Sequence, residues 1–360
     1  MPLDLRTKKL AKILVDFCTF VKSGENVIIS GNTESEPLLL AVYKEVILAG
    51  AHPILKIGLK EAAPFFYKHA QPHQINNYPY ILEGMINKSH KYIGVASESN
   101  TKELSNCNPK KITARARVTK RISDLICNNY PKMCRVTTSY PTGALAQDAE
   151  MSLNEYEDFF YKATIGVDWK KLQKKMAKIK VKFREGSSVH LIGEGINLKM
   201  KVHGKRAASD LERPENMPAG EVFMAPFRES LNGWIKFDFP AIRDGKEVAD
   251  IELKFENGQV IEAKASKNED FLKEMLTVDE NSSYVGELGI GCNPRITKFT
   301  KNLLFDEKIS GTIHLALGMA YKENGGGNDS AIHWDIVKDM KKAKIIVDGK
   351  VIQENGAWKI

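Results

Sequence analysis

The sequence lacks features that would place the protein in or across a membrane. Its apolar runs all fall short of the roughly 18 residues that a membrane span requires. The amino-terminal stretch from Met1 to Arg6 does not have the charged-then-apolar layout of a signal peptide. We therefore expect a cytoplasmic protein that has no membrane partner.

Cysteine is scarce and forms no recognisable motif. The five cysteines are scattered over 360 residues, and no two of them stand at the two-residue gap that zinc knuckles and redox motifs use. An odd number of dispersed thiols is typical of a reducing compartment, in which they lie buried and inert. The cysteines therefore favour an intracellular protein over a disulfide scaffold.

Nucleotide-binding glycine motifs are also missing. No Gly-x-Gly-x-x-Gly follows the first predicted strand, and the glycines at 325–327 lack the Lys-Ser/Thr pair of a phosphate-binding loop. The net charge is +8, but lysine-rich stretches such as 170–175 do not alternate with aromatic residues. A solvated helix face explains them better than a nucleic-acid site does. We expect no nucleic-acid partner.

Length and periodicity predict two domains. A chain of 360 residues exceeds the roughly 100–200 residues of an average domain. Helical and strand-like apolar spacings alternate in the first half, which is the rhythm of parallel βαβ units. We predict an open α/β sheet domain over residues 1–180. Its expected elements are helices over 5–21 and 36–48 and strands over 26–30, 53–58 and 91–96.

The pattern changes after a charged helix expected over 169–179. Strands and tight turns then dominate, with Asp244-Gly245 and Asn257-Gly258 as hairpin signals. These turns would join strands over 233–239, 248–255 and 260–265 into a meander. The sequence therefore predicts an α+β domain over residues 181–360, and this domain carries the potential metal site.

The second half gathers six potential metal ligands. About three or four protein groups suffice for one divalent ion that keeps an open water position. Six groups, some of them bridging, therefore suit a hydrolytic site with two metal ions. The six candidates are Glu221, Glu287, Glu307, His314, His333 and Asp335.

Local context distinguishes these candidates. His333 and Asp335 stand two residues apart in an apolar stretch that we interpret as a strand, so their side chains point to the same face. His314 and Glu287 lie in apolar runs, where an unpaired imidazole or carboxylate is costly. Glu307 is explained equally well as a solvated turn residue. Taken singly, each candidate also has a purely structural explanation.

In their order along the chain, the segments that hold these candidates resemble those of the thermophilic metallo-aminopeptidase family. The resemblance implies that the six candidates bind two divalent ions, chosen among Zn, Co, Mn and Mg, and that Tyr321 is the catalytic tyrosine. It also implies peptide substrates and a homodimer. The similar segments are Met217–Pro226, Gly286-Glu287, Phe305-Asp306-Glu307, His314–Gly318 with Tyr321, and Gly326–Ser330 leading to His333 and Asp335.

Two other functions stay open. His314, His333 and Asp335 alone would form the two-histidine, one-carboxylate triad of a mononuclear non-haem iron dioxygenase that opens aromatic rings. The glutamates at the other candidate positions argue against this alternative, because a one-metal enzyme has less need of them. A basic interaction protein without catalysis is the third possibility, and the presence of all six candidates argues against it.

Overall fold

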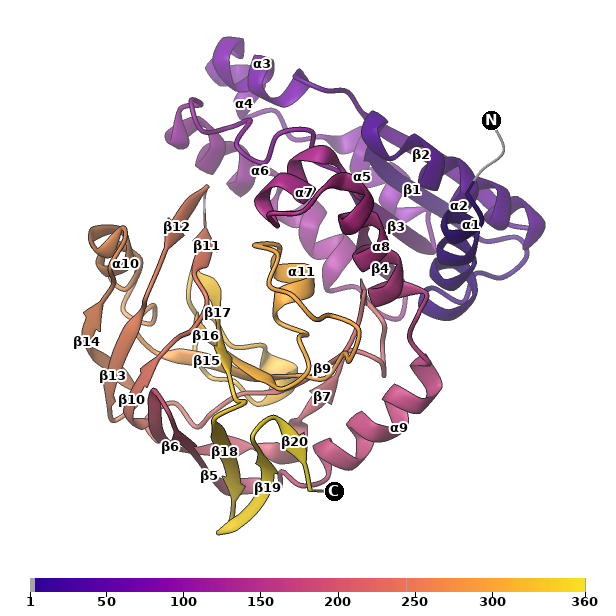
Figure 1. Cartoon of the computed structure of the whole chain (residues 1–360). Helices are drawn as coiled ribbons and strands as arrows, with labels where there is room; N and C mark the ends of the chain where they lie inside the picture. The colour runs from indigo at the N-terminus through magenta and orange to yellow at the C-terminus, as the bar shows by residue number, and fades with distance from the viewer. Residues whose placement is uncertain (1–3, 244, 360) are drawn as a thin grey trace. The chain divides into compact units, whose positions relative to one another are not determined.

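The computed structural model describes residues 4–243 and 245–359 of the chain. These residues form two compact units (Figure 1). The first comprises the residues up to 165 together with 214–218, and the second comprises 166–213 and the residues from 219 onward. The domain boundary expected after residue 180 stays a prediction. Helix α9 (Trp169–Lys180), which precedes that position, is grouped with the second unit.

The first unit is built on a parallel sheet with the strand order β2-β1-β3-β4-β8. Its strand β1 buries Val27, Ile28 and Ile29 completely, as expected for a parallel strand that is covered on both faces. The strands are β1 (Asn26–Asn32), β2 (His52–Gly58), β3 (Lys91–Ala96), β4 (Cys134–Ser139) and β8 (Asn216–Met217).

The helices of this unit follow the predicted alternation, with one difference. The helix expected over 5–21 changes form after α1 and continues as a π-helix over Ile13–Cys18. It ends where the hydroxyl of Thr19 donates a 2.8 Å hydrogen bond to the carbonyl of Leu14. The α-helices are α1 (Leu5–Lys12), α2 (Glu36–Leu48), α3 (Ala62–His69), α4 (Pro72–Ile75), α5 (Tyr80–Asn87), α6 (Pro109–Cys127), α7 (Gly143–Asp148) and α8 (Leu153–Thr164).

The second unit consists mainly of antiparallel strands. Its larger sheet has the order β14-β13-β10-β6-β5-β18-β19-β20, and a hairpin of β11 and β12 is separate from it. The strands are β5 (Glu185–Gly193), β6 (Ile196–His203), β10 (Asn232–Lys236), β11 (Ala241–Arg243), β12 (Lys246–Val248), β13 (Glu252–Glu256), β14 (Gln259–Lys264), β18 (Ala343–Val347), β19 (Lys350–Glu354) and β20 (Ala357–Trp358).

The expected meander of three strands is confirmed in part, but a further hairpin interrupts it. Strands β10, β13 and β14 are neighbours, and the turn at Asn257-Gly258 is confirmed by positive φ angles of 47° and 84°, which a two-residue hairpin turn needs. The hairpin of β11 and β12 is inserted between β10 and β13 along the chain. Asp244, in the other predicted turn, lies outside the described residues.

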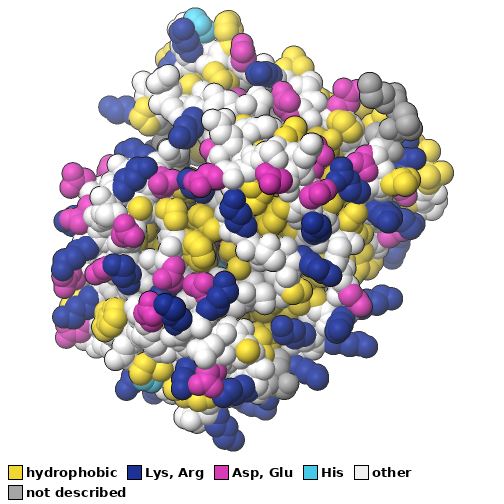
Figure 2. Space-filling view, viewed as in Figure 1, with side chains coloured by type: hydrophobic (Ala, Val, Ile, Leu, Met, Phe, Trp, Pro, Cys, Tyr) yellow, Lys and Arg dark blue, Asp and Glu magenta, His cyan; other side chains and the backbone are white. Residues whose placement is uncertain are grey.

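Helix α9 explains the lysine-rich stretch. It buries Trp169, Leu172, Met176 and Ile179, while the lysines between them are mostly exposed. Figure 2 shows lysine and arginine side chains interspersed with acidic ones over the visible face. Such a helix has one packed stripe and one solvated stripe. The unit's other α-helices are α10 (Glu269–Met275) and α11 (Leu303–Asp306).

A second sheet of this unit holds most of the ligand candidates. Its order is β17-β16-β15-β9-β7, and every residue of β15 and β16 is buried. One face of these two strands carries Leu and Ile side chains, and the other carries glycine, alanine, Glu287 and His314. The strands are β7 (Ala208–Ser209), β9 (Glu221–Met224), β15 (Val285–Gly291), β16 (Thr312–Gly318) and β17 (His333–Asp339).

The predicted fold class, an open α/β unit combined with an α+β unit, is confirmed by these sheets. The parallel pairing occurs in the first unit and the antiparallel pairing in the second. Among the described residues, no helix is both long and apolar enough to cross a membrane.

Candidate metal centre

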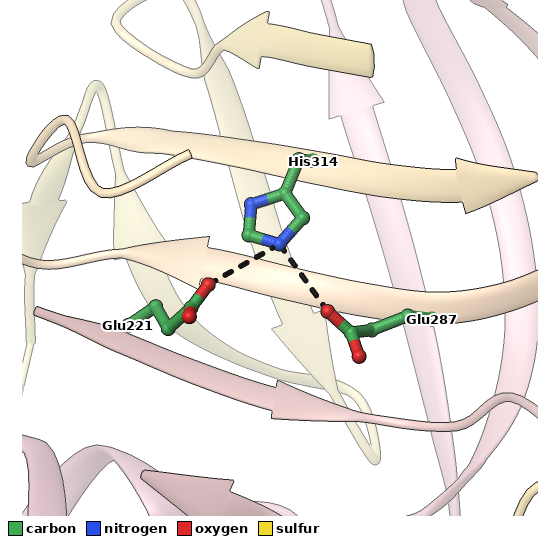
Figure 3. Close-up of side chains that lie close together, drawn as sticks. All are labelled: Glu221, Glu287 and His314. Carbon is green, nitrogen blue, oxygen red and sulfur yellow. Dashed lines mark ion pairs between the residues drawn. The ribbon is translucent and has the colours of Figure 1, made fainter. Parts of the chain in front are cut away.

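Four neighbouring strands bring five of the six candidates together. Glu221 begins β9, Glu287 lies on β15, and His314 lies on β16 (Figure 3). His333 and Asp335 both lie on β17, the strand that pairs with the other side of β16. The cluster is therefore built across the sheet, from residues spread between positions 221 and 335 of the chain.

The local register places these side chains on one face. A β-bulge at Gly286 shifts the pairing of β15 with β16 by one residue, so that Glu287 lies opposite Ala316. Ala316 in turn lies opposite Asp335 on β17. Bulges commonly redirect side chains next to functional sites. Here the bulge puts Glu287 on the same face as Asp335.

Glu287 is shared by two groups of potential ligands. One group is Glu221, Glu287 and His314, and the other is Glu287, His333 and Asp335; within each group the ligand atoms lie within 4.8 Å of one another. Nε2 of His314 lies 3.4 Å from Oε1 of Glu287 and 3.5 Å from Oε2 of Glu221 (Figure 3). The arrangement has oxygen and nitrogen donors that suit zinc, cobalt or manganese.

Buried polar atoms in the cluster support a metal ion. Both ring nitrogens of His314 and Oδ1 of Asp335 are buried, and none has a hydrogen-bond partner among the described residues. A buried polar group without a partner costs free energy. A cation bound among the carboxylates would give Nε2 of His314 and Oδ1 of Asp335 a partner, so the residues fit a metal site.

Gly289 makes room for the imidazole of His314. The two residues are paired across β15 and β16, and a Cβ atom at Gly289 would lie only 1.8 Å from Nε2 and 2.0 Å from Cε1 of the histidine. Any side chain at this position would therefore displace the ring. This close approach explains the glycine at position 289 of β15.

The backbone orients the second imidazole. Nδ1 of His333 donates to the carbonyl of Met319 at 2.8 Å, and Nε2 faces Oδ2 of Asp335 at 3.5 Å. Metal-binding histidines commonly use one ring nitrogen for such a hydrogen bond and the other for the ion. His333 and Asp335 thus lie on one strand face, as their spacing predicts.

The charges of the cluster shift its pKa values strongly. Burial disfavours the protonated rings, but the neighbouring carboxylates raise the pKa of His314 to about 9 and of His333 to about 10. Burial also disfavours the carboxylate of Asp335, yet His333 lowers its pKa to about 2. Burial raises the pKa of Glu221 well above its ordinary value.

Tyr321 lies beside the second ligand group. Its ring centroid is 5.3 Å from that of His333, and the residue is 39% exposed. Desolvation and the nearby acids, Glu287 first among them, raise the pKa of the phenol above its ordinary value. The hydroxyl therefore stays protonated at neutral pH and is available as a hydrogen-bond donor.

Glu307 occupies a different position from the other five candidates. It follows α11 as the residue at the helix carboxyl end, and its carboxylate pairs with the ammonium group of Lys308. It belongs to neither of the two ligand groups found among the described residues. The structure therefore places Glu307 next to the cluster and binds it to a lysine.

Two further residues of the centre were missed by the sequence analysis. The carboxylate of Asp210 accepts hydrogen bonds from the backbone N–H groups of Gly220 at 2.7 Å and Glu221 at 3.1 Å. Lys308 is fully buried, with its nitrogen 3.7 Å from Oε1 of Glu221. No local pattern distinguishes either residue from a solvated acid or lysine, because their roles depend on contacts between distant segments.

Similar proteins agree with a metalloprotease. The family model of the thermophilic metalloproteases (M29) matches residues 3–358. Aminopeptidase AmpS of Bacillus subtilis is 33% identical over 208 residues, which cover 49% of this chain and 50% of that protein. Aminopeptidase 2 of Geobacillus stearothermophilus is 24% identical over 405 aligned positions, which cover 97% of both chains. The chain thus matches about half the length of AmpS and nearly all of Aminopeptidase 2.

Solved structures share the fold. Wild-type AmpT from Thermus thermophilus superposes with a TM-score of 0.84 at 22% identity, covering 99% of each chain. The 2,5-dihydroxypyridine dioxygenase from Pseudomonas putida KT2440 superposes with a TM-score of 0.61 at 12% identity, covering 99% of this chain and 98% of that one. At these identities the likeness concerns the fold alone.

The resemblance inferred from motifs between residues 217 and 335 is confirmed by the family match, which extends over nearly the whole chain. The fold, the motifs and the family model agree with one another. This chain belongs to the thermophilic metalloprotease (M29) family.

Proposed function

We propose that the protein is a metallo-aminopeptidase with a dinuclear centre, which hydrolyses amino-terminal residues from peptides. The observation that carries the proposal is the pair of ligand groups that share Glu287. A carboxylate in that position can bridge two ions, and a bridged pair of divalent ions is a common hydrolytic centre. The printed names of similar proteins, Aminopeptidase AmpS and Aminopeptidase 2, support the reaction class.

Five side chains would hold the two ions. Glu221, His314 and Glu287 would hold one, and Glu287, His333 and Asp335 the other. Three protein donors for each ion leave a position for water or substrate. Two divalent ions, among Zn, Co, Mn and Mg, would supply Lewis acidity and a water molecule of lowered pKa.

The protein's own groups would manage the proton and the developing charge. The Tyr321 hydroxyl would donate a hydrogen bond to the carbonyl oxygen of the scissile bond as that oxygen becomes negative. Its raised pKa keeps the phenol protonated for this role. Glu221 or Glu287 would accept the proton of the attacking water, since both carboxylates face the cluster.

The test combines metal analysis with a blocked substrate. The chain would be loaded in turn with Co, Zn, Mn and Mg and assayed on a set of aminoacyl chromogenic amides, with the same amides acetylated at the amino group as the matched control. We expect about two ions per chain, as a dinuclear centre requires, and hydrolysis of the free amines alone. Equal hydrolysis of the acetylated amides, or none with any metal, would contradict the proposal.

Loading the chain with iron and measuring oxygen consumption addresses the alternative of a ring-cleaving dioxygenase. That enzyme would use His314, His333 and Asp335 for one iron. Nε2 of His314 lies 3.9 Å from Oδ1 of Asp335, farther than from either glutamate of its own ligand group. One iron per chain together with oxygen consumption would favour the dioxygenase over the peptidase.

We further propose that the enzyme acts as a homodimer in the cytoplasm. The family resemblance supports the dimer, and five cysteines that are scattered along the sequence without a recognisable motif support a reducing compartment. Sedimentation analysis of the active chain tests the first claim. A monomer with full activity would overturn it.

A further inference from the structure

A buried cation lies beside one half of the ligand cluster. The Lys308 side chain is 0% exposed, pairs with Glu307, and lies 3.7 Å from Oε1 of Glu221. Two carboxylates thus enclose the buried amine, and a buried lysine that is paired with carboxylates is held as an ammonium ion. Lys308 therefore places a positive charge inside the protein, beside Glu221.

This lysine uses carboxylate oxygens that a metal ion could otherwise bind. Oε1 of Glu221 faces Lys308, while Oε2 of the same residue faces Nε2 of His314 at 3.5 Å. The partner Glu307 has a side chain only 13% exposed and points its Oε1 to Lys308. One oxygen of Glu221 is thus left for an ion, and Glu307 is kept out of the ligand group.

The other half of the cluster has no such competitor. Within the described part of the chain, the ion pairs of Asp335 are to His333 and His314, and Glu287 pairs with His314. No lysine or arginine there forms an ion pair with either carboxylate. Their charges are therefore available to a divalent cation.

We propose that Lys308 is a resident cation that makes the two metal positions unequal in affinity. The positive charge repels a second cation in a poorly screened interior, so the position of Glu221, Glu287 and His314 binds its ion weakly. The position of Glu287, His333 and Asp335 binds tightly. The inference rests on the proposed dinuclear function, and it adds a regulation: activity follows the filling of the weaker position and so the supply of free metal.

Calorimetric titration of the chelator-stripped full chain with Co²⁺ tests the inference. Wild type is expected to show two steps whose dissociation constants differ by roughly tenfold or more, the range over which neighbours of a metal site act. In Lys308→Met the weaker step tightens by roughly tenfold, because the repelling charge is gone and Glu307 is released. The tighter step keeps its affinity.

Two companion variants assign the steps to positions. Glu221→Gln removes the weaker step, and Asp335→Asn removes the tighter one. Lys308→Gln offers a second way to remove the charge, since its amide still hydrogen-bonds Glu307 and keeps the buried polar groups satisfied. The same tightening is expected from it.

Lys338 provides the matched control. It is also a buried lysine, and it pairs with Asp238 at 2.9 Å. It lies on β17, where it alternates to the face opposite Asp335. Lys338→Met is expected to lower the melting temperature and leave the ratio of the two dissociation constants unchanged.

Several outcomes overturn the inference. These are equal affinities in wild type, an unchanged or weakened second step in both Lys308 variants, or an equal tightening in Lys338→Met. If wild type binds one ion, a second ion gained by the variants supports the inference, and one ion throughout overturns it. If neither Lys308 variant folds, the inference is decided by two results: whether wild type shows two unequal binding steps, and whether Glu221→Gln removes the weaker one. Two equal steps would leave the proposed peptidase intact, whereas failure to cleave peptides would leave the binding result intact.

Discussion

The two halves of the ligand cluster are constructed differently. His333 and Asp335 come from one strand, β17, and lie on one face because of strand alternation. Glu221 and His314 come from β9 and β16, which are separated by β15. The first half depends on local geometry, and the second depends on the packing of three strands.

This difference extends to the groups that support the ligands. The carbonyl of Met319 orients His333 through a 2.8 Å hydrogen bond. Around Glu221, by contrast, Asp210 binds the backbone and Lys308 binds the side chain. A half assembled from distant segments and buried charges is more vulnerable to single substitutions. We therefore expect variants of the Glu221 half to lose metal while the His333 half keeps it.

Gly289→Ala is expected to have the largest effect. The new Cβ atom would lie 1.8 Å from Nε2 of His314, so the ring has to leave its place and the Glu221 half can no longer form. Hydrolysis should fall to background, and metal analysis should show the loss of one ion. Gly84→Ala is the control, because nothing lies within 4 Å of a Cβ atom there. Full activity of Gly289→Ala would refute the account of His314.

Tyr321→Phe should affect turnover without affecting either half. Loss of one donor to a developing oxyanion lowers kcat by about 10²-fold or more, while the phenyl ring can keep its place beside His333. Steady-state kinetics and metal analysis check both claims. Tyr284→Phe, whose ring faces Arg228, should behave as wild type. An unaltered kcat in Tyr321→Phe would remove Tyr321 from the mechanism.

A pair of aspartate variants compares the two halves directly. Asp210 binds the backbone of Glu221, and Asp279 accepts a 2.7 Å hydrogen bond from the N–H of Ala331, shortly before β17. Asp210→Asn should weaken the Glu221 step of Co²⁺ binding by roughly tenfold, and Asp279→Asn the His333 step to a lesser degree. Calorimetric titration of both variants measures this. Identical effects on both steps would show that the halves are not separate.

The sequence predicts the His333 half of the ligand cluster better than the Glu221 half. Strand alternation predicts that His333 and Asp335 share a face, and their 3.5 Å contact agrees. The pairing of Asp210 with the backbone of Glu221 spans eleven positions, between which the chain makes turns and forms the short strand β8, a path that no periodicity describes. Lys308 reads as a surface lysine until its burial is known.

The fold shows the same contrast between local and distant determinants. The βαβ alternation and the Asn257-Gly258 turn are local signals, and both predictions are confirmed. The helix expected over 5–21 is confirmed up to Cys18, but its second part is π-helical over Ile13–Cys18, a local change of hydrogen-bond pattern that apolar spacing does not predict. The bulge at Gly286 likewise depends on the partner strand β16, which the sequence of β15 does not identify.

The smallest expected effect is a difference in proton release between the halves. Without metal, the raised pKa values keep His314 protonated up to about pH 9 and His333 up to about pH 10. The stability that the two protonated rings contribute to the fold is therefore complete below about pH 6.5 and is lost as the pH rises through these pKa values. A metal ion takes the place of each proton. Affinity should therefore rise with pH, and calorimetry in buffers of different ionisation enthalpy should detect protons released at pH 8 from both halves. At a pH between these two pKa values, the protons released on metal binding should come mainly from the His333 half. Asp335→Asn disrupts that half and should abolish the proton release in this pH range. Proton release that persists in this variant would show that His314 titrates at the higher pH.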